Sequence, residues 1–282
     1  MFEVGSKKKR VIDLFRPSSV IQQVKSVRRR LQIPKTENEK RLKALRNKHD
    51  RQRCFIIGNG PSLKISDLDL LKDEVTFAFN KIYLAYDQTE FRPTYYAVSD
   101  VNVIRNNSDI INELPDESIK LFPYDYDHLI YATETTIFFN FEYDYLHYTK
   151  TPRFSRNPLL CMYCGGTVTT KALQLAYYMG ISDVYLVGID FSFEVPKRKV
   201  PNGMVVSDGE TNHFHPDYRK EGEVWGLPDL ELQERSYRLA KEIYENDGRR
   251  IFNATRGGKL EVFPRVDFDS LFVDRTEPVL NG

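Results

Sequence analysis

CFIIGNGPSL, residues 54–63, is an apolar run that passes directly into a turn containing two glycines. Gly58 and Gly60 can take backbone angles that residues with a Cβ resist, which lets main-chain N–H groups approach an anion closely. Asn59 and Ser62 add side-chain hydrogen-bonding groups, and Ser62 can also cap a short helix that follows. The pattern predicts a phosphate or nucleotide site, although an ordinary strand-to-helix turn has the same glycine spacing.

Beyond this stretch, apolar strands alternate with helical stretches, which is the pattern of an α/β fold with a largely parallel sheet. One helix is expected over residues 167–178 and ends at Gly180, and another over residues 230–246 ends near Gly248. The expected strands cover residues 54–57, 75–79, 95–98, 119–122, 136–141, 184–187 and 250–252.

The composition is that of a soluble globular chain, with 41% hydrophobic and 29% charged residues in a length of 282. The chain lacks an apolar run of about 18 residues that could span a bilayer. Its N-terminus lacks the apolar centre and the cleavage site of a secretory signal. Cysteines occur only at Cys54, Cys161 and Cys164, which fits a reducing compartment and leaves no second pair for a zinc site. These features predict a cytoplasmic protein.

Charge divides the chain into a basic arm and an acidic body. Residues 1–51 contain 16 Lys/Arg and 5 Asp/Glu, a net charge of +11, and the other 25 basic and 35 acidic residues give −10. An aliphatic repeat with helical spacing runs through the arm at Val20, Val24, Val27 and Leu31. We expect residues 7–31 to bind an anionic membrane surface or another subunit, unless the helix packs on its own domain. No aromatic residue is interleaved with the arginines, so nucleic-acid binding is not expected.

In open α/β sheets, ligands bind beyond the carboxyl ends of the strands. Polar residues follow four of the expected strands at that point, and others open the helix that begins at residue 167. These residues are Asn59, Gly60 and Ser62; Asn80 and Lys81; Ser99, Asp100 and Asn102; Asp190 and Ser192; and Gly165, Gly166 and Thr167. Each has a local alternative role, such as a turn residue or a helix cap. Their coincidence at one edge predicts a ligand site there.

Taken together, these motifs carry a family resemblance. GNGPSL after the first strand, an Asn after the second, a glycine pair before a helix, the string MGISDVYLVGIDFSF and a later histidine segment resemble the bacterial lipooligosaccharide sialyltransferases. The same core is similar to that of the motility-associated flagellin glycosyltransferases and of the archaeal MptE-like pterin diphosphokinases. The resemblance covers residues 53–255. It implies a Rossmann-like, GT-A-type domain with a mostly parallel sheet and helices on both faces.

The resemblance also implies inverting transfer of an acidic nonulosonic or Kdo-like sugar from a CMP-activated donor to a glycan acceptor, without a metal cofactor. The positions carried over are Asn59, Gly60 and Ser62 for the phosphate and ribose, Asn80 for the nucleotide or donor sugar, and Gly165, Gly166 and Thr167 for the cytidine pocket.

The general base falls in the segment Thr211-Asn212-His213-Phe214-His215, because histidine titrates near neutral pH, as a base for a sugar hydroxyl should. We assign His215 as the base and His213 as the second choice, with Asp190 in the same catalytic group. If the segment is extended, both histidines lie on one face and could instead bind a metal with Asp190 or Asp217. A loop histidine without a chemical role is the remaining alternative.

The sequence departs from these sialyltransferases at one point, since Ser192 and Phe193 stand where they have tyrosines that bind the leaving phosphate. The basic run at residues 197–199 could neutralise that phosphate instead. It lies in a polar segment, residues 193–226, that we expect to act as a lid. The donor sugar can therefore differ from sialic acid.

We expect three parts in the chain: a basic helical arm (1–51), a nucleotide-binding catalytic domain (52–255) and a tail packed on it (256–282). Arg256 begins the tail at the ligand edge and could bind a carboxylate or phosphate with its planar guanidinium. The leading functional hypothesis is a glycosyltransferase of surface-polysaccharide or glycoconjugate assembly, self-associating and held at the inner face of the cytoplasmic membrane. The alternatives are an MptE-like, Mg-ATP-dependent pyrophosphokinase and a non-catalytic nucleotide-binding scaffold.

Overall fold

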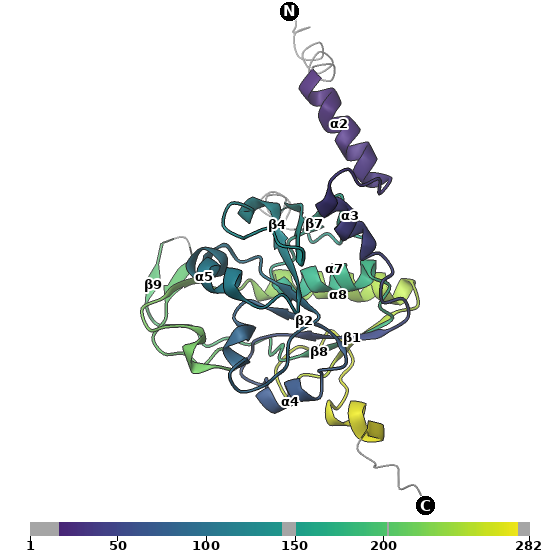
Figure 1. The fold of residues 1–282 in the computed structure, drawn as a ribbon. Helices are drawn as coiled ribbons and strands as arrows, with labels where there is room; N and C mark the ends of the chain where they lie inside the picture. Colours follow the sequence, from purple (N-terminus) through teal and green to yellow (C-terminus); the bar gives the residue numbers. More distant parts are fainter. Residues whose placement is uncertain (1–16, 143–150, 202, 276–282) are drawn as a thin grey trace, which may run out of the picture.

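The computed structural model describes residues 17–142, 151–201 and 203–275, which are organised around one parallel sheet (Figure 1). Its seven strands have the order β12-β8-β1-β2-β3-β4-β5, and each neighbouring pair is parallel. The strands are β1 (Arg53–Ile57), β2 (Val75–Phe79), β3 (Tyr95–Ala97), β4 (Ile119–Pro123), β5 (Thr136–Phe139), β8 (Asp183–Val187) and β12 (Arg250–Asn253). They correspond to the seven strands expected from the sequence. The predicted Rossmann-like α/β fold is confirmed.

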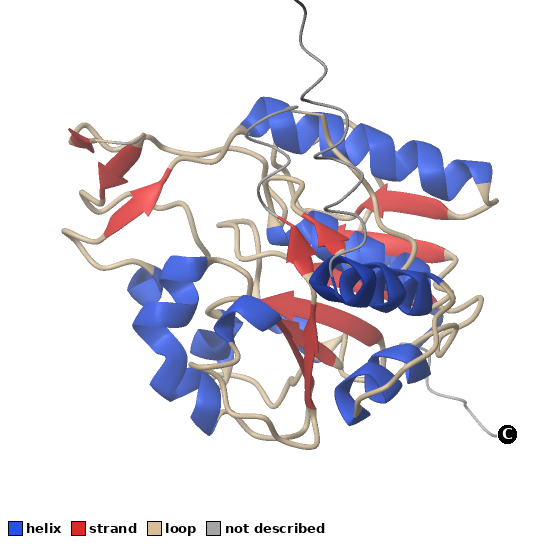
Figure 2. Ribbon diagram, turned by 90° about the horizontal axis from the view of Figure 1, so that it is seen from above, coloured by secondary structure: helices blue, strands red, loops and turns tan. Residues whose placement is uncertain are grey.

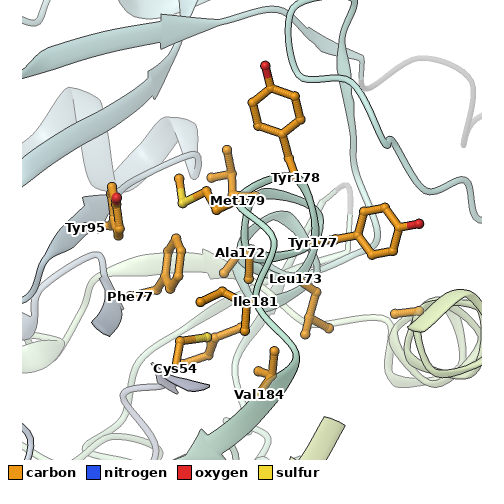
Figure 3. Packing of buried hydrophobic residues seen from close by; sticks show 14 of the residues in the cluster. Cys54, Phe77, Tyr95, Ala172, Leu173, Tyr177, Tyr178, Met179, Ile181 and Val184 are labelled. Atoms are coloured by element: carbon orange, nitrogen blue, oxygen red, sulfur yellow. The ribbon is translucent and has the colours of Figure 1, made fainter. Parts of the chain in front are cut away.

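Apolar side chains leave both faces of the sheet, because successive residues of a strand point to opposite sides. In β1, Cys54 and Ile56 belong to one buried cluster and Phe55 and Ile57 to the other. Figure 3 shows the first cluster, where α7 (Val168–Tyr178) packs beside Cys54. Strand β1 is thus buried on both faces, which explains its continuous apolar sequence.

Helices cover both faces of the sheet, as the resemblance implied (Figure 1). The first cluster lies under α3, α7 and α8, and the second lies under α4, α5 and three short 3-10 segments, η1, η2 and η4. The bounds of these elements and of a further 3-10 segment, η3, are α3 (Glu37–Ala44), α8 (Leu230–Asn246), α4 (Ile65–Asp69), α5 (Val101–Glu113), η1 (Ile82–Ala85), η2 (Tyr124–Tyr126), η3 (Pro216–Tyr218) and η4 (Asp269–Arg275).

The N-terminal part does not divide at residue 51 as expected. Helix α3 packs on the edge strand β5, where Asn38 Nδ2 donates to Phe138 O and Phe138 N donates to Asn38 Oδ1, both at 2.7 Å. The amide of Asn38 thus pairs with the open edge of the sheet, as a further strand would. Leu42 and Leu45 are buried in the first core cluster. The segment from α3 onward belongs to the domain, because these leucines complete its core.

Helix α2 (Pro17–Arg30) extends away from the body (Figure 1) and is tied to α3 by an ion pair. Arg28 Nη1 and Nη2 donate to the two carboxylate oxygens of Glu39 at 2.6 and 2.8 Å. Glu39 also completes a capping box with Thr36 at the start of α3. The helical arm expected from the sequence therefore contains α2, and the C-terminal end of this helix is anchored to the domain.

The aliphatic side chains in the last turns of α2 and just beyond it face solvent. Val24, Val27 and Leu31 are 61%, 55% and 66% exposed. Their partner, a membrane surface or another subunit, stays a prediction, and residues 7–16 of the arm lie outside the described residues. None of the described helices is long and apolar enough to cross a membrane.

The segment expected to act as a lid contains a small antiparallel sheet of β9 (Lys199–Val200), β10 (Met204–Val206) and β11 (Val224–Gly226). Figure 2 shows this sheet standing apart from the main one. Strands β6 (Phe141–Glu142) and β7 (Met162–Tyr163) form a further parallel pair. In the tail, Phe268 and Phe272 are buried in the second core cluster.

The turns that leave β1 and β8 stay paired beyond the ends of the strands. Gly58 N donates to Val187 O at 2.7 Å, and Gly60 N donates to Gly188 O at 3.0 Å. A Cβ on Gly58 would overlap the carbonyl oxygen of Gly188, whereas neither Gly58 nor Gly60 has a positive φ. Glycine is needed here because two backbones approach each other closely. The backbone freedom expected from the sequence is not the reason.

We expect Gly58→Ala to lower the free energy of unfolding by about 1–3 kcal/mol, because the added methyl group meets main-chain atoms that cannot rotate away. Urea denaturation followed by circular dichroism measures this change. The matched control is Gly226→Ala, since a Cβ there would meet only the Met204 sulfur, at 3.4 Å. Equal stability of the two variants would contradict the close approach of these turns.

Candidate functional site

A cavity of about 150 Å³ lies at the carboxyl ends of β1 and β8. The chain continues from β1 to one side of the sheet, while β8 and β12 lie on the other side, so the cavity is at the point where the strand order reverses. Crevices at such points are the usual ligand sites of open α/β sheets. The residues predicted from the sequence that line it are Gly58, Asn59, Gly60, Asn80, Thr167, Asp190, Ser192 and His213.

Asn59 and Asn80 line the cavity from the turns after β1 and β2. Asn59 Nδ2 donates to Phe79 O at 3.1 Å, and its Oδ1 is buried without a hydrogen bond to any described residue. Asn80 has a φ of 50°, a left-handed conformation that asparagine tolerates. Its main-chain oxygen accepts a hydrogen bond from the Tyr96 hydroxyl at 2.6 Å. The two turns are thus held in place while the buried Asn59 oxygen remains an unused acceptor.

Asp190 joins three turns at the floor of the cavity. Ser62 Oγ donates to Asp190 Oδ2 at 2.8 Å, and Lys259 N donates to the main-chain oxygen of Asp190 at 2.7 Å. Burial raises the pKa of the Asp190 carboxyl, which the hydrogen bonds from Ser62 partly oppose. Ser62 is therefore directed at Asp190 and does not line the cavity, contrary to its expected place on a phosphate.

The structure separates the two candidate histidines. His213 lines the cavity. The Nδ1 atom of His215 accepts a hydrogen bond from Asp217 N at 3.1 Å and so caps η3, which begins at Pro216. His215, the first choice for the base, does not line the cavity, and His213, the second choice, does. The expectation of one shared face does not hold, because η3 takes up the side chain of His215.

The His213 ring lies flat against Tyr218, with ring centroids 3.7 Å apart and an interplanar angle of 7°. Burial, together with the positive charges of Arg219 and Lys81, lowers the pKa of His213 to about 3. The ring is therefore uncharged at neutral pH. Among the described residues it makes no hydrogen bond, so its nitrogens are available to a ligand.

The start of α7 forms another wall. Thr167 Oγ1 accepts a hydrogen bond from Thr169 N at 3.4 Å, as an N-cap does. Gly166 has a φ of 77°, and its oxygen accepts a hydrogen bond from Gln233 Nε2 at 3.0 Å. Gly165 lies behind this wall, where a Cβ would overlap the side chain of Thr170.

Two residues of α8, Gln233 and Tyr237, line the cavity and were not chosen from the sequence. They lie on the buried face of an amphipathic helix, so their spacing indicated only packing. A Gln on that apolar face was the one available signal.

Four further predicted residues lie away from this cavity. Lys81 Nζ donates to Tyr218 O at 2.8 Å, and burial lowers its pKa. Ser99 and Asp100 line a second, neighbouring cavity, and Asp100 also caps α5. Arg256 Nε and Nη2 donate to Asp67 at 2.8 and 3.1 Å, so its guanidinium ties the tail to α4.

The basic run expected to neutralise a leaving phosphate is not at the cavity. Residues 197–199 are exposed and line neither the first cavity nor its two neighbours.

The alternative hypothesis, that the two histidines bind a metal ion with Asp190 or Asp217, gains no support from the arrangement of these side chains. No group of three His, Cys, Asp or Glu side chains within the described ranges is placed to hold a metal ion. Asp190 is engaged by Ser62, and Asp217 is 80% exposed in its side chain.

Comparisons with known proteins give a family match and a similar solved structure. A family model described as "6-hydroxymethylpterin diphosphokinase MptE-like" matches residues 30–196. One similar solved structure is the sialyltransferase CstII from Campylobacter jejuni in complex with a substrate analogue, cytidine-5'-monophosphate. It is 13% identical, with a TM-score of 0.43, over 77% of this chain and 85% of that chain. A comparison with curated proteins gives no match.

The low pKa of His213 predicts how the stability of the fold depends on pH. An unfolded histidine has a pKa near 6.5, whereas the pKa of His213 in the fold is about 3. Between these values the unfolded chain binds a proton that the folded chain does not, so stability falls as the pH falls. Between pH 7.5 and pH 5.0 we expect wild type to lose about 2 kcal/mol more than His213→Gln.

Urea denaturation at the two pH values measures that difference. His213→Phe, which keeps an aromatic ring against Tyr218, should behave like His213→Gln. If wild type and both variants lose the same free energy, the imidazole is solvated and the argument for its uncharged state is wrong.

Proposed function

The chain belongs to the MptE-like family, and from that premise we propose that it is a transferase that acts on a nucleotide-activated substrate held in the cavity at β1 and β8. More specifically, we propose a glycosyltransferase that moves an acidic sugar from a CMP-activated donor to a hydroxyl group of a glycan acceptor. The observation that carries this proposal is the uncharged His213 at a cavity walled by main-chain turns and a helix N-terminus.

The walls suit a nucleotide. The N-terminus of α7 carries partial positive charge, which favours a phosphate in front of Thr167. The buried Oδ1 of Asn59 can accept a hydrogen bond from a ribose hydroxyl or a base amine. Gln233 and Tyr237 supply a polar and an aromatic surface on the opposite side. The phosphate and the nucleoside thus each find a fitting partner.

In the proposed reaction, the acceptor hydroxyl oxygen attacks the anomeric carbon of the donor and forms the new glycosidic bond. The bond between that carbon and the phosphate oxygen breaks, and the electron pair leaves with the nucleoside monophosphate. The hydroxyl proton goes to a ring nitrogen of His213. Because the phosphate brings negative charge beside the ring, donor binding raises the proton affinity of His213 toward the range of an effective base.

The second candidate function is a diphosphokinase, which the description of the family model favours. Such a reaction uses Mg²⁺, which binds carboxylates together with substrate phosphates. The described residues near the cavity offer Asp190, whose carboxylate accepts from Ser62, and Asp100, whose carboxylate caps α5. This donor set fits Mg²⁺ poorly. The family model also ends at residue 196, before the segment that contains His213.

A thermal-shift panel of CMP, CTP, UDP, GDP, AMP and ATP, each with and without Mg²⁺, tests the proposal. A ligand that binds only the folded chain stabilises it, by about 2.7 kcal/mol at a concentration about one hundred times its Kd. This stabilisation raises the melting temperature. We expect CMP to stabilise the protein without Mg²⁺. Stabilisation by Mg-ATP alone would favour the diphosphokinase, and no shift with any nucleotide would reject both.

A pair of histidine variants tests the base. CMP release from CMP-N-acetylneuraminate is measured with the acceptor lactose, with CMP binding as the control for an intact site. We expect His213→Ala to lower kcat about 10²- to 10⁴-fold, because the proton acceptor is lost. His215→Ala removes only the cap of η3 and should cost about 1 kcal/mol of stability with a much smaller effect on kcat. A larger loss with His215→Ala than with His213→Ala would reverse the assignment.

A further inference from the structure

A second cavity, of about 440 Å³, adjoins the first. The two share Asn80, Thr167, Phe193, His213 and Tyr218 among their walls, so His213 and Tyr218 separate one from the other. Volumes of this size are typical of small-molecule sites. A group bound in the second cavity would therefore lie next to the proposed base.

Lys171 is a buried cation in the wall of the second cavity. It lies in α7 and is only 6% exposed. Its amine lies 3.5 Å from Thr167 O, at the limit of a hydrogen bond, and 4.8 Å from the centre of the Phe141 ring. No carboxylate of the described residues lies within 4.0 Å of that amine. A lysine buried in this way is rare, since burying an unpaired ammonium is costly.

Arg219 contributes a second cation to the walls of this cavity. Its guanidinium lies over the Trp225 ring, 4.0 Å from the ring centre, and its Nε forms an ion pair with Glu210 Oε1 at 3.5 Å that lacks hydrogen-bond geometry. Its terminal nitrogens form no hydrogen bond within the described ranges. The indole N–H of Trp225 is buried and also lacks an acceptor. This wall therefore carries more hydrogen-bond donors than acceptors.

The acidic groups near the second cavity leave these donors largely unused. Asp100 lines the cavity, but its carboxylate accepts hydrogen bonds from Asn102 N and Val103 N at 2.8 and 3.3 Å. Glu210 accepts a hydrogen bond from Ser207 Oγ at 2.8 Å through its other oxygen. The buried Lys171 amine thus has no ion-pair partner among the described residues, whereas the half-buried Arg219 guanidinium is paired with Glu210 through Nε alone.

We propose that the second cavity is an anion subsite, in which Lys171 and Arg219 bind a carboxylate or phosphate group of a substrate. Its place beside the first cavity rests on the proposed function, whereas the binding of an anion does not. Two sources share this chemistry: an acidic donor sugar that extends from the nucleotide, and an acceptor that carries an acidic group.

An anion in this position would accept hydrogen bonds from the Lys171 amine and the Arg219 guanidinium. The ammonium can donate three hydrogen bonds, and the guanidinium presents a planar fork that matches a carboxylate or phosphate. Burial lowers the pKa of Lys171, and a bound anion would oppose that shift by favouring the charged form. A bound anion would therefore stabilise the charged form of Lys171, which burial disfavours in the free protein.

Isothermal titration with inorganic phosphate, D-glucuronate and D-glucose measures the subsite without any nucleotide. We expect the two anions to bind and the neutral sugar not to bind. Lys171→Met should weaken anion binding about 10- to 100-fold, because it removes a charge-assisted hydrogen bond while keeping the length of the side chain. It should also raise the melting temperature by about 2–4 °C, since a buried unpaired charge is removed.

Lys199→Met is the matched control, because it removes an exposed lysine of β9 that lines neither cavity. We expect it to leave anion binding and melting temperature unchanged. Arg219→Gln provides an independent test, with a similar loss of anion binding. Anion binding that Lys171→Met and Arg219→Gln both leave intact would overturn the proposal, whatever the nucleotide panel shows.

Titration with CMP and CMP-N-acetylneuraminate distinguishes the two sources. If the donor sugar supplies the anion, Lys171→Met should weaken the binding of CMP-N-acetylneuraminate and leave the binding of CMP unchanged. If the acceptor supplies the anion, Lys171→Met should bind both nucleotides as tightly as wild type does. The variant should then no longer bind glucuronate in the presence of CMP. Either result supports the subsite, provided that the anions bind wild type.

Discussion

The pairing of the turns after β1 and β8 is the constraint on which the rest of the structure depends. Two hydrogen bonds continue the parallel ladder past the strand ends, and the glycines allow the backbones to meet. Asp190 then joins these turns to the loop after β12 through Ser62 and Lys259. The buried carboxylate binds the first of these loops and the main-chain oxygen of Asp190 binds the last, so the three loops hold one another in a single arrangement.

The position of the cavity follows from this junction. Strands β2 to β5 continue to one side and β12 lies on the other, so the segments that leave the junction diverge and a crevice opens between them. The Asn59 carbonyl accepts the Phe214 amide at 3.0 Å, which brings the histidine segment across the crevice. The burial that lowers the pKa of His213 is a consequence, since Tyr218 covers the ring from behind.

The strands and the edge of the site could be predicted from the sequence because both depend on periodicity and chain order, which are local. Apolar runs mark the strands, and polar residues after them must gather at one edge. Side-chain direction depends on tertiary contacts and could not be predicted. Ser62 and Arg256 were expected to face a ligand but face Asp190 and Asp67. The spacing of His213 and His215 did not reveal which one η3 would take as its cap.

The walls of the two cavities differ in how they affect the stability of the fold, and this difference bears on function. Around the first cavity, turns are closed by hydrogen bonds and glycine contacts, so its walls gain stability from their own arrangement. Around the second, Lys171 is buried without an ion-pair partner among the described residues, at a cost to the folded state. Residues that weaken a fold in this way are expected where a ligand restores the missing interactions. The burial of Lys171 is therefore better explained by a ligand than by packing.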